Sequence, residues 1–126
     1  MAAGRAMAGD LSPGTVILLS GDLGAGKTAF VRGLAAGLRA NPDDVSSPTF
    51  TLIQEYRGGR LLLRHVDLYR LTPPEVDELG LDELTLGNVV TAIEWPDRLT
   101  HALGVVTVRV HIAHGAGDTR TIQVQR

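Results

Sequence analysis

The feature that most constrains the fold of this chain is the octapeptide Gly-Asp-Leu-Gly-Ala-Gly-Lys-Thr at residues 21–28. It matches the pattern G-x-x-x-x-G-K-[ST] and lies between an apolar run, Thr15–Ser20, and a segment with helical spacing that starts at Thr28. Glycines let such a turn curl until its N–H groups point inward, and the following helix places its positive end there. The octapeptide predicts a strand, a phosphate-binding turn and a helix.

The lysine of this turn stands out because the other basic residues of the chain are arginines. Of the 12 basic residues, Lys27 is the one lysine. A compact ammonium reaches the β- and γ-phosphates of a nucleotide where the larger guanidinium fork of Arg does not fit, and the Thr28 hydroxyl is a ligand for Mg²⁺. We expect Lys27 to face solvent. The expected nucleotide-binding residues of this segment are Asp22, Leu23, Gly24, Ala25, Gly26, Lys27, Thr28 and Ala29.

Two alternatives to this interpretation stay open. An arginine bias in the composition, with Lys27 retained by chance, would also explain the count of lysines. A glycine-rich turn before a helix can also exist without any ligand.

Length and composition limit the classes of protein to which the chain can belong. With 126 residues and 44% apolar content, residues 1–126 are expected to form a single domain around one core. The chain has no cysteine, which excludes disulfides and thiolate metal sites and fits a reducing cytoplasm. A net charge of −2 gives no overall positive field for autonomous nucleic-acid binding. No apolar run approaches the roughly 18 residues of a membrane helix, so we expect no membrane partner.

The rest of the chain predicts a sheet with two antiparallel hairpins. Two β-prone runs, 50–57 and 60–69, flank Gly58-Gly59, which predicts a two-residue turn with partner numbers that sum to 117. The other expected elements are a short helix before Pro13, the helix from Thr28 to near Asn41, a capping box at Thr72–Glu75 with a helix stopping at Gly80, a buried strand at Val89–Ile93, a helix at Asp97–Leu103 and a C-terminal hairpin.

Two acidic residues follow predicted strands. Asp67 comes after the run Leu61–Val66, and Glu94 comes after Val89–Ile93. Ligands of open α/β sheets bind outside the carboxyl ends of parallel strands, where the glycine-rich turn also lies. Nucleotide hydrolysis at such a turn needs one acidic group for Mg²⁺ and another that positions water, and these two residues supply them. An ordinary turn or cap residue at 67 and a plain strand-end acid at 94 are the alternatives.

Two other segments are candidates for the same edge. The predicted hairpin register brings Ser47-Pro48-Thr49 beside Asp67, either as a loop that meets the γ-phosphate or as a plain connector. Trp95 either stacks on a base or fills the core. We expect the arginines of the first hairpin and the acidic stretch 75–83 to be solvated surface, and we assign no role to His65, His101, His111 and His114.

Four motifs in order resemble the TsaE (YjeE) family from about Pro13 to the C-terminal hairpin. They are residues 21–28, Ser47-Pro48-Thr49-Phe50-Thr51, His65-Val66-Asp67-Leu68-Tyr69-Arg70-Leu71 and Ile93-Glu94-Trp95-Pro96. The expected fold is α/β, a P-loop NTPase-like three-layer sandwich with a mixed, mostly parallel sheet, an antiparallel hairpin and a C-terminal antiparallel hairpin.

The resemblance also implies a function. Members are bacterial ATPases that use ATP and Mg²⁺, work with the TsaB and TsaD proteins, and reset or regulate the complex that places threonylcarbamoyl on adenosine 37 of tRNA. Contact with tRNA is then only indirect, and the location is cytoplasmic. Carried over by motif, Lys27 and Thr28 bind phosphate and Mg²⁺, and Glu94 is the acidic residue of the metal site. In the same way Asp67 is needed for hydrolysis, and Trp95 lies by the nucleotide. Thr49 is expected among the nucleotide-binding residues from the hairpin register alone.

Two departures from the family pattern affect the nucleotide. Ala29 stands where members often have a second Thr, which removes one hydroxyl contact to the α-phosphate. The chain begins Met1-Ala2-Ala3-Gly4 where members have an extra strand and a Thr-bearing turn, so we expect either a truncated start or a differently built adenine side.

Three other functions were compared with the ATPase. A small-molecule kinase is one alternative, disfavoured because 126 residues leave no room for an acceptor domain. A GTPase would need an Asn-Lys-x-Asp motif, which is absent. A nucleotide-sensing interaction module without significant hydrolysis stays open as an alternative.

Overall fold

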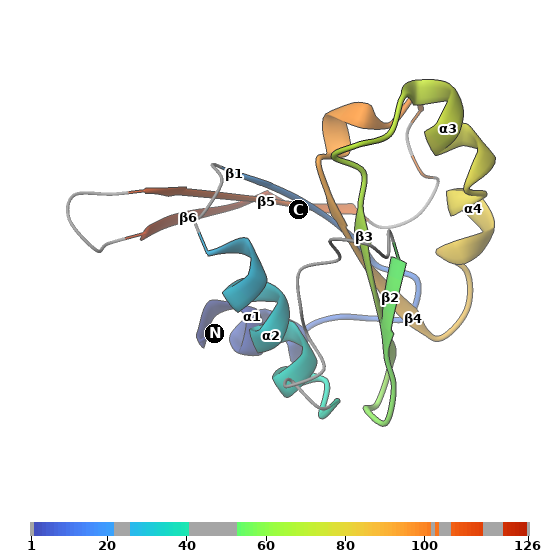
Figure 1. Cartoon of the computed structure of the whole chain (residues 1–126). Coiled ribbons are helices and arrows are strands. Elements are labelled where there is room, and N and C mark those ends of the chain that lie inside the picture. The colour runs from blue at the N-terminus through green and yellow to red at the C-terminus, as the bar shows by residue number, and fades with distance from the viewer. Residues whose placement is uncertain are drawn as a thin grey trace.

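A six-stranded sheet forms the centre of the computed structural model, which describes residues 2–21, 26–40, 53–101, 103, 107–114 and 120–125. Its strands are β1 (Val16–Gly21), β2 (Ile53–Tyr56), β3 (Leu62–Asp67), β4 (Val89–Glu94), β5 (Thr107–His114) and β6 (Arg120–Gln125). They lie in the order β2-β3-β4-β1-β5-β6 (Figure 1). β1 pairs in parallel with β4 and β5, and β3 pairs in parallel with β4. The pairs β2–β3 and β5–β6 are the two antiparallel hairpins, so the expected mixed, mostly parallel sheet is confirmed.

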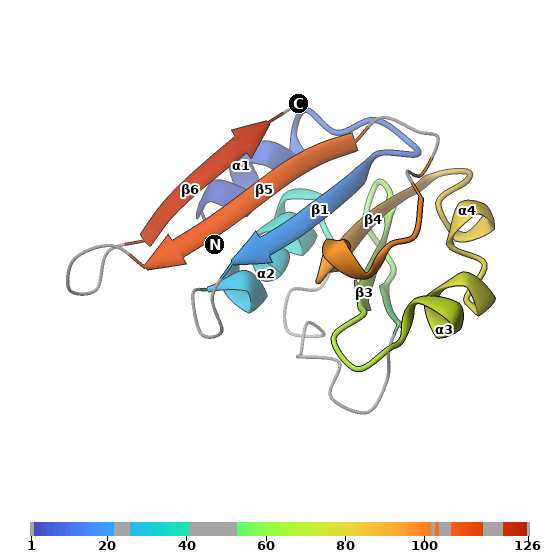
Figure 2. The same cartoon turned by 90° about the horizontal axis from the view of Figure 1, so that it is seen from above.

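Helices cover both faces of this sheet. α1 (Ala2–Ala8) and α2 (Lys27–Gly37) lie together on one face, and α3 (Pro73–Glu78) and α4 (Leu81–Leu84) lie on the other (Figures 1 and 2). The alternation of side chains along β1 explains why two cores form. Ile17 and Leu19 are buried in the cluster that contains α2, whereas Val16 and Leu18 belong to the cluster with Val76 of α3. The three-layer arrangement is therefore the expected one.

The parallel pairs bring three strand ends to one edge of the sheet. Asp67, the last residue of β3, lies opposite Glu94, the last residue of β4. Leu19, two residues before the end of β1, also lies opposite Glu94. The chain leaves β1 at this edge and returns to it as α2, whose first residue is Lys27. The fold therefore places Lys27, Asp67 and Glu94 at the same rim.

The register of the first hairpin differs from the prediction by two. Ile53 pairs with Val66 and Tyr56 with Leu63, so partner numbers sum to 119 instead of 117. The reason is a tertiary contact of the turn: the Arg60 N–H donates to the Leu38 carbonyl oxygen at the end of α2, with an N···O distance of 2.8 Å. Packing of the turn against α2 moves its centre away from Gly58-Gly59. A shift of two keeps each side chain on its expected face.

Two helix boundaries also differ from the sequence prediction. The helix expected at Asp97–Leu103 is only the 3₁₀ turn η2 (Pro96–Arg98), because Leu99 returns to extended backbone with ψ 139°. α2 ends at Gly37, before Asn41, because Arg39 takes a left-handed conformation with φ 64° and the Ala40 N–H donates to the Ala35 carbonyl. This pattern is a Schellman motif closed without a glycine. The capping box at Thr72–Glu75 is confirmed.

Two of the four arginines at 57, 60, 64 and 70 tie elements together, whereas we expected a solvated face; the other two, Arg57 and Arg70, are exposed as expected. Arg60 donates to the carbonyl oxygens of Ala8 and Leu11, which ties α1 to the turn. Arg64 donates to Glu55 at 2.8 Å and to the Leu84 carbonyl at the end of α4.

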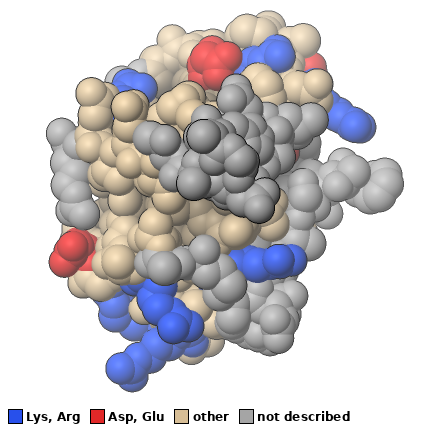
Figure 3. All heavy atoms as spheres, turned by 90° about the vertical axis from the view of Figure 1, so that its left-hand side faces the viewer, with Lys and Arg blue, Asp and Glu red and all other residues tan. Residues whose placement is uncertain are grey.

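The acidic residues of α3 and α4 are exposed as expected, and basic side chains gather at the lower end of the face shown in Figure 3. None of the helices described is long and apolar enough to cross a membrane.

Gly59 is the residue on which the hairpin–helix contact depends. A Cβ at this position would lie 2.2 Å from the Leu38 carbonyl oxygen and 2.9 Å from the Ala40 nitrogen. We expect Gly59→Ala to lower the free energy of unfolding by about 1–3 kcal/mol, because backbone has to move to relieve the overlap. Urea denaturation checks this, with Gly9→Ala as the matched control. The nearest atom to a Cβ at Gly9 is 3.7 Å away, and that variant should stay within about 0.5 kcal/mol of the wild type. Equal stability of the two variants would contradict the close packing.

Candidate functional site

The start of α2 is built to receive an anion. Gly26 caps the helix in a left-handed conformation with φ 100°, and no side chain caps it. The Phe30 N–H donates to the Gly26 carbonyl oxygen, which is the first hydrogen bond of the helix. The backbone N–H groups before Phe30 in this turn therefore have no acceptor within the helix. Thr28 and Ala29 are partly exposed there. Amides without an intrahelical acceptor and the positive end of an 11-residue helix suit a phosphate.

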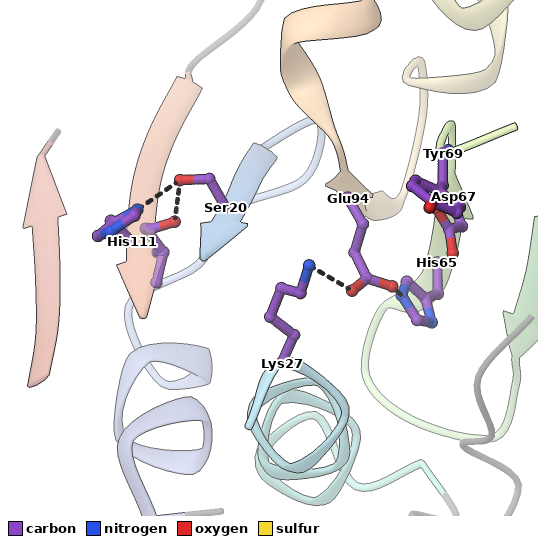
Figure 4. A network of polar contacts seen from close by, with 8 residues as sticks. Ser20, Lys27, His65, Asp67, Tyr69, Glu94 and His111 are labelled. Carbon is purple, nitrogen blue, oxygen red and sulfur yellow. Dashed lines mark hydrogen bonds and ion pairs between the residues drawn. The ribbon is translucent and has the colours of Figure 1, made fainter. Parts of the chain in front are cut away.

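Lys27 is buried, contrary to our expectation that it faces solvent. Lys27 and Glu94 are each 7% exposed. Nζ of Lys27 lies 3.7 Å from Oε1 of Glu94. The other oxygen of that carboxylate, Oε2, lies 2.7 Å from Nε2 of His65, a fully buried residue of β3 (Figure 4). Lys27 is drawn inward because a carboxylate buried beside it needs a cation and a donor. The three side chains form a line from α2 across the rim of the sheet.

The two carboxylates predicted to work together occupy different environments. Burial alone would raise the pKa of Glu94, but the hydrogen bond with His65 and the neighbouring Lys27 ammonium outweigh it and hold this pKa below its ordinary value. Burial is also the largest effect on Asp67, and there it prevails: the pKa of Asp67 is raised, although its Oδ1 accepts the Tyr69 N–H at 3.0 Å. Glu94 is therefore stabilised in its charged form and Asp67 is not.

Two aromatic side chains complete the described part of the site. The Trp95 ring centroid lies 5.0 Å from Nζ of Lys27, within the range of a cation–π contact. The Tyr69 ring lies 4.8 Å from that of Trp95 and is tilted by 38°. Trp95 has a left-handed backbone with φ 60°, which turns the chain directly after Glu94. Trp95 thus contacts Lys27 on one side and is partly buried against the core cluster that contains Val76 of α3.

Other residues at this edge of the sheet lie apart from the cluster. Ser20 points to the opposite face of the sheet, where its Oγ lies 2.9 Å from Nδ1 of His111 (Figure 4). Asp22, Leu23, Gly24 and Ala25 lie outside the described residues, and so does Thr49. The expected contact between Ser47–Thr49 and Asp67 is untested for the same reason, and the register that led to it is shifted by two.

His65 and Tyr69 were missed at the sequence level. The signal that could have found them is the spacing His65-x-Asp67-x-Tyr69: residues two apart in a strand face the same side, so His65 had to share a face with Asp67. Its bond to Glu94 was not predictable, because it depends on how β3 aligns with β4.

Comparisons with known proteins agree on one family. The family model described as "Threonylcarbamoyl adenosine biosynthesis protein TsaE" matches residues 1–122. A relative from Synechocystis sp. is 48% identical over 100 residues, which are 76% of this chain and 63% of the relative. A Bacillus subtilis relative is 44% identical over 110 residues, 87% of this chain and 68% of its own length. Both are named "tRNA threonylcarbamoyladenosine biosynthesis protein TsaE". The chain spans just under two thirds of the length of the Synechocystis protein.

A solved structure confirms the fold. The crystal structure of Bacillus subtilis YdiB matches this chain with a TM-score of 0.71 at 36% sequence identity, over 94% of this chain and 72% of YdiB. The α/β, P-loop NTPase-like fold expected from the sequence is therefore the fold that the chain adopts.

The opposite pKa shifts of the two acids predict opposite effects on stability. Because the pKa of Glu94 is lowered in the folded state, its contribution is fully present above its ordinary value of 4.5 and is lost as the pH falls below it. We expect Glu94→Gln to be less stable than the wild type at pH 7, and the difference to shrink as the pH is lowered toward 3 and below. The measurement is the free energy of unfolding in urea as a function of pH.

Asp67→Asn should show the reverse trend in the same experiment. The raised pKa makes ionised Asp67 unfavourable in the folded state, so the variant gains stability relative to the wild type as the pH rises above the ordinary value of 3.8. Glu83→Gln, at an exposed position of α4, is the control for removal of one surface carboxylate. Parallel pH profiles for the variants at 67 and 94 would contradict the difference between the two environments.

Proposed function

The chain belongs to the TsaE family, and on that premise we propose that it binds and hydrolyses ATP as an accessory subunit in tRNA threonylcarbamoyladenosine biosynthesis. It acts as one ATPase domain in the cytoplasm, where it cycles the TsaB–TsaD transferase complex and meets tRNA only through that complex. The observation that carries the proposal is the line Lys27–Glu94–His65, which ends at the uncapped start of α2 with Asp67 beside it.

The residues at the rim fit a nucleotide triphosphate. In the proposed complex, the free amides at the start of α2 and the octapeptide cradle the phosphates, and Lys27 exchanges Glu94 for phosphate oxygens as its anionic partner. The exchange is favoured because the ammonium already lies at the helix start and is 3.7 Å from the carboxylate, beyond ordinary hydrogen-bond distance. Trp95 lies against Lys27 and helps to exclude water from this side.

The same residues fit Mg²⁺, a hard cation that prefers oxygen ligands and that nucleotide phosphates help to hold. The Thr28 hydroxyl and the carboxylate of Glu94 are the groups that would bind it, and the lowered pKa of Glu94 supports this assignment because a ligand has to be ionised. The ion would neutralise charge that develops on the transferring phosphoryl group.

Asp67 has the properties of the group that positions and deprotonates water. Its raised pKa brings it closer to the value at which a carboxylate accepts a proton, and the Tyr69 N–H fixes one of its oxygens. Two acids with pKa values shifted in opposite directions suit two roles, one at the metal and one at the attacking water.

The first test concerns ATP binding and uses two substitutions of Lys27. Lys27→Ala should weaken ATP binding at least 100-fold, because phosphate loses its ammonium partner. Lys27→Arg keeps a positive charge beside Glu94 but presents a wider fork, so it should remain more stable than Lys27→Ala and still bind ATP poorly. Calorimetric titration with ATP and Mg²⁺ measures both affinities. ATP affinity within threefold of the wild type in either folded variant would contradict the assigned role.

The second test separates hydrolysis from nucleotide sensing. We expect Asp67→Asn to bind ATP within about threefold of the wild type while turnover falls at least 100-fold, because an amide cannot take a proton from water. Turnover is measured for the chain alone and with TsaB and TsaD, with and without Mg²⁺. A wild-type protein that binds ATP but releases no phosphate under any of these conditions would be a sensing module without hydrolysis.

A further inference from the structure

His65 is the fully buried titratable side chain to which the proposed mechanism gives no task. It is 0% exposed and comes from β3, whose backbone places it opposite Ala92, two residues before Glu94. A buried imidazole costs free energy relative to an apolar side chain of similar size unless its nitrogens are hydrogen-bonded. Its one hydrogen bond among the described residues joins Nε2 to Oε2 of Glu94 (Figure 4).

The two contacts of the Glu94 carboxylate are not equivalent. Oε2 lies 2.7 Å from His65, a short hydrogen bond, whereas Oε1 lies 3.7 Å from Lys27, beyond ordinary hydrogen-bond distance. The position of the carboxylate is therefore set by His65 and only assisted by Lys27. His65 is also held by the sheet, whereas the long side chain of Lys27 has several rotatable bonds.

The hydrogen bond between His65 and Glu94 has a defined direction. A carboxylate only accepts, so the proton lies on Nε2 of His65 and the ring donates to Oε2. The other ring nitrogen, Nδ1, is buried and has no hydrogen-bond partner in the part of the chain that the structure describes. The contact with Glu94 is therefore the polar contact that the described structure gives to this ring.

We propose that His65 is a positioning residue that keeps the Glu94 carboxylate at the metal site when Lys27 turns to phosphate. The inference rests on the proposed function, in which Lys27 exchanges its partner and Glu94 holds Mg²⁺. After that exchange, His65 is the described side chain that still binds Glu94. It keeps Oε2 fixed and leaves Oε1 directed toward the start of α2, where Thr28 lies.

The test measures how much Mg²⁺ strengthens binding of a non-hydrolysable ATP analogue, by calorimetry with and without the metal. We expect His65→Leu to lose at least tenfold of this gain, because residues that orient a metal ligand typically contribute 10- to 100-fold. Affinity without Mg²⁺ should stay within threefold of the wild type. In turnover, kcat should fall at least tenfold with little change in KM.

Rescue distinguishes positioning from a merely structural role. His65→Gln retains an N–H donor of similar reach and should recover the Mg²⁺ gain to within about threefold of the wild type. If His65→Leu does not fold, His65→Asn, whose amide is too short to reach Oε2, carries the same expectation. His111→Leu, at an exposed histidine on the opposite face of the sheet, is the matched control and should behave as the wild type.

The outcomes separate the two proposals. A full Mg²⁺ gain in folded His65→Leu, or equal losses in His65→Leu and His65→Gln, would overturn the role of His65 and leave the proposed ATPase standing. Absence of analogue binding in the wild type, with or without Mg²⁺, would overturn the proposed function and the role of His65 with it.

Discussion

A carboxylate taken out of water is unstable unless charged or donating groups surround it, and this constraint organises the rim of the sheet. Glu94 is 7% exposed at the end of a fully buried strand, β4. Its two oxygens are directed to Lys27 on the first turn of α2 and to His65 on β3. One buried charge thereby connects a helix and two strands, and it ties the start of α2 to the sheet.

The sequence predicted the parts of this site that follow from backbone topology. The octapeptide indicated a strand, a turn and a helix, and parallel pairing was enough to bring Asp67 and Glu94 to one edge. The sequence did not predict the burial of Lys27, because no residue near it in the chain indicates that the Glu94 carboxylate lies beside it in the fold. The predicted hairpin register was wrong for a similar reason: the Arg60 N–H of the turn donates to the Leu38 carbonyl oxygen, a contact between residues 22 apart along the chain.

The difference between the two acids shows how one edge can support two chemical tasks. Asp67 and Glu94 are paired residues at the ends of neighbouring strands, yet their pKa values shift in opposite directions. Burial acts to raise both pKa values. At Glu94 the His65 hydrogen bond and the Lys27 ammonium outweigh it, whereas at Asp67 burial prevails over the Tyr69 N–H, and the neighbouring Glu94 adds to the rise. A mechanism that needs one permanently ionised ligand and one proton acceptor is compatible with this asymmetry.

The most direct measurement is a crystal structure of the chain with a non-hydrolysable ATP analogue and Mg²⁺. Our account predicts that Nζ of Lys27 moves from Glu94 to phosphate oxygens at the start of α2, while Glu94 keeps its hydrogen bond to His65 and contacts the metal. A structure in which Lys27 stays paired with Glu94, with the phosphates bound away from that helix, would contradict it.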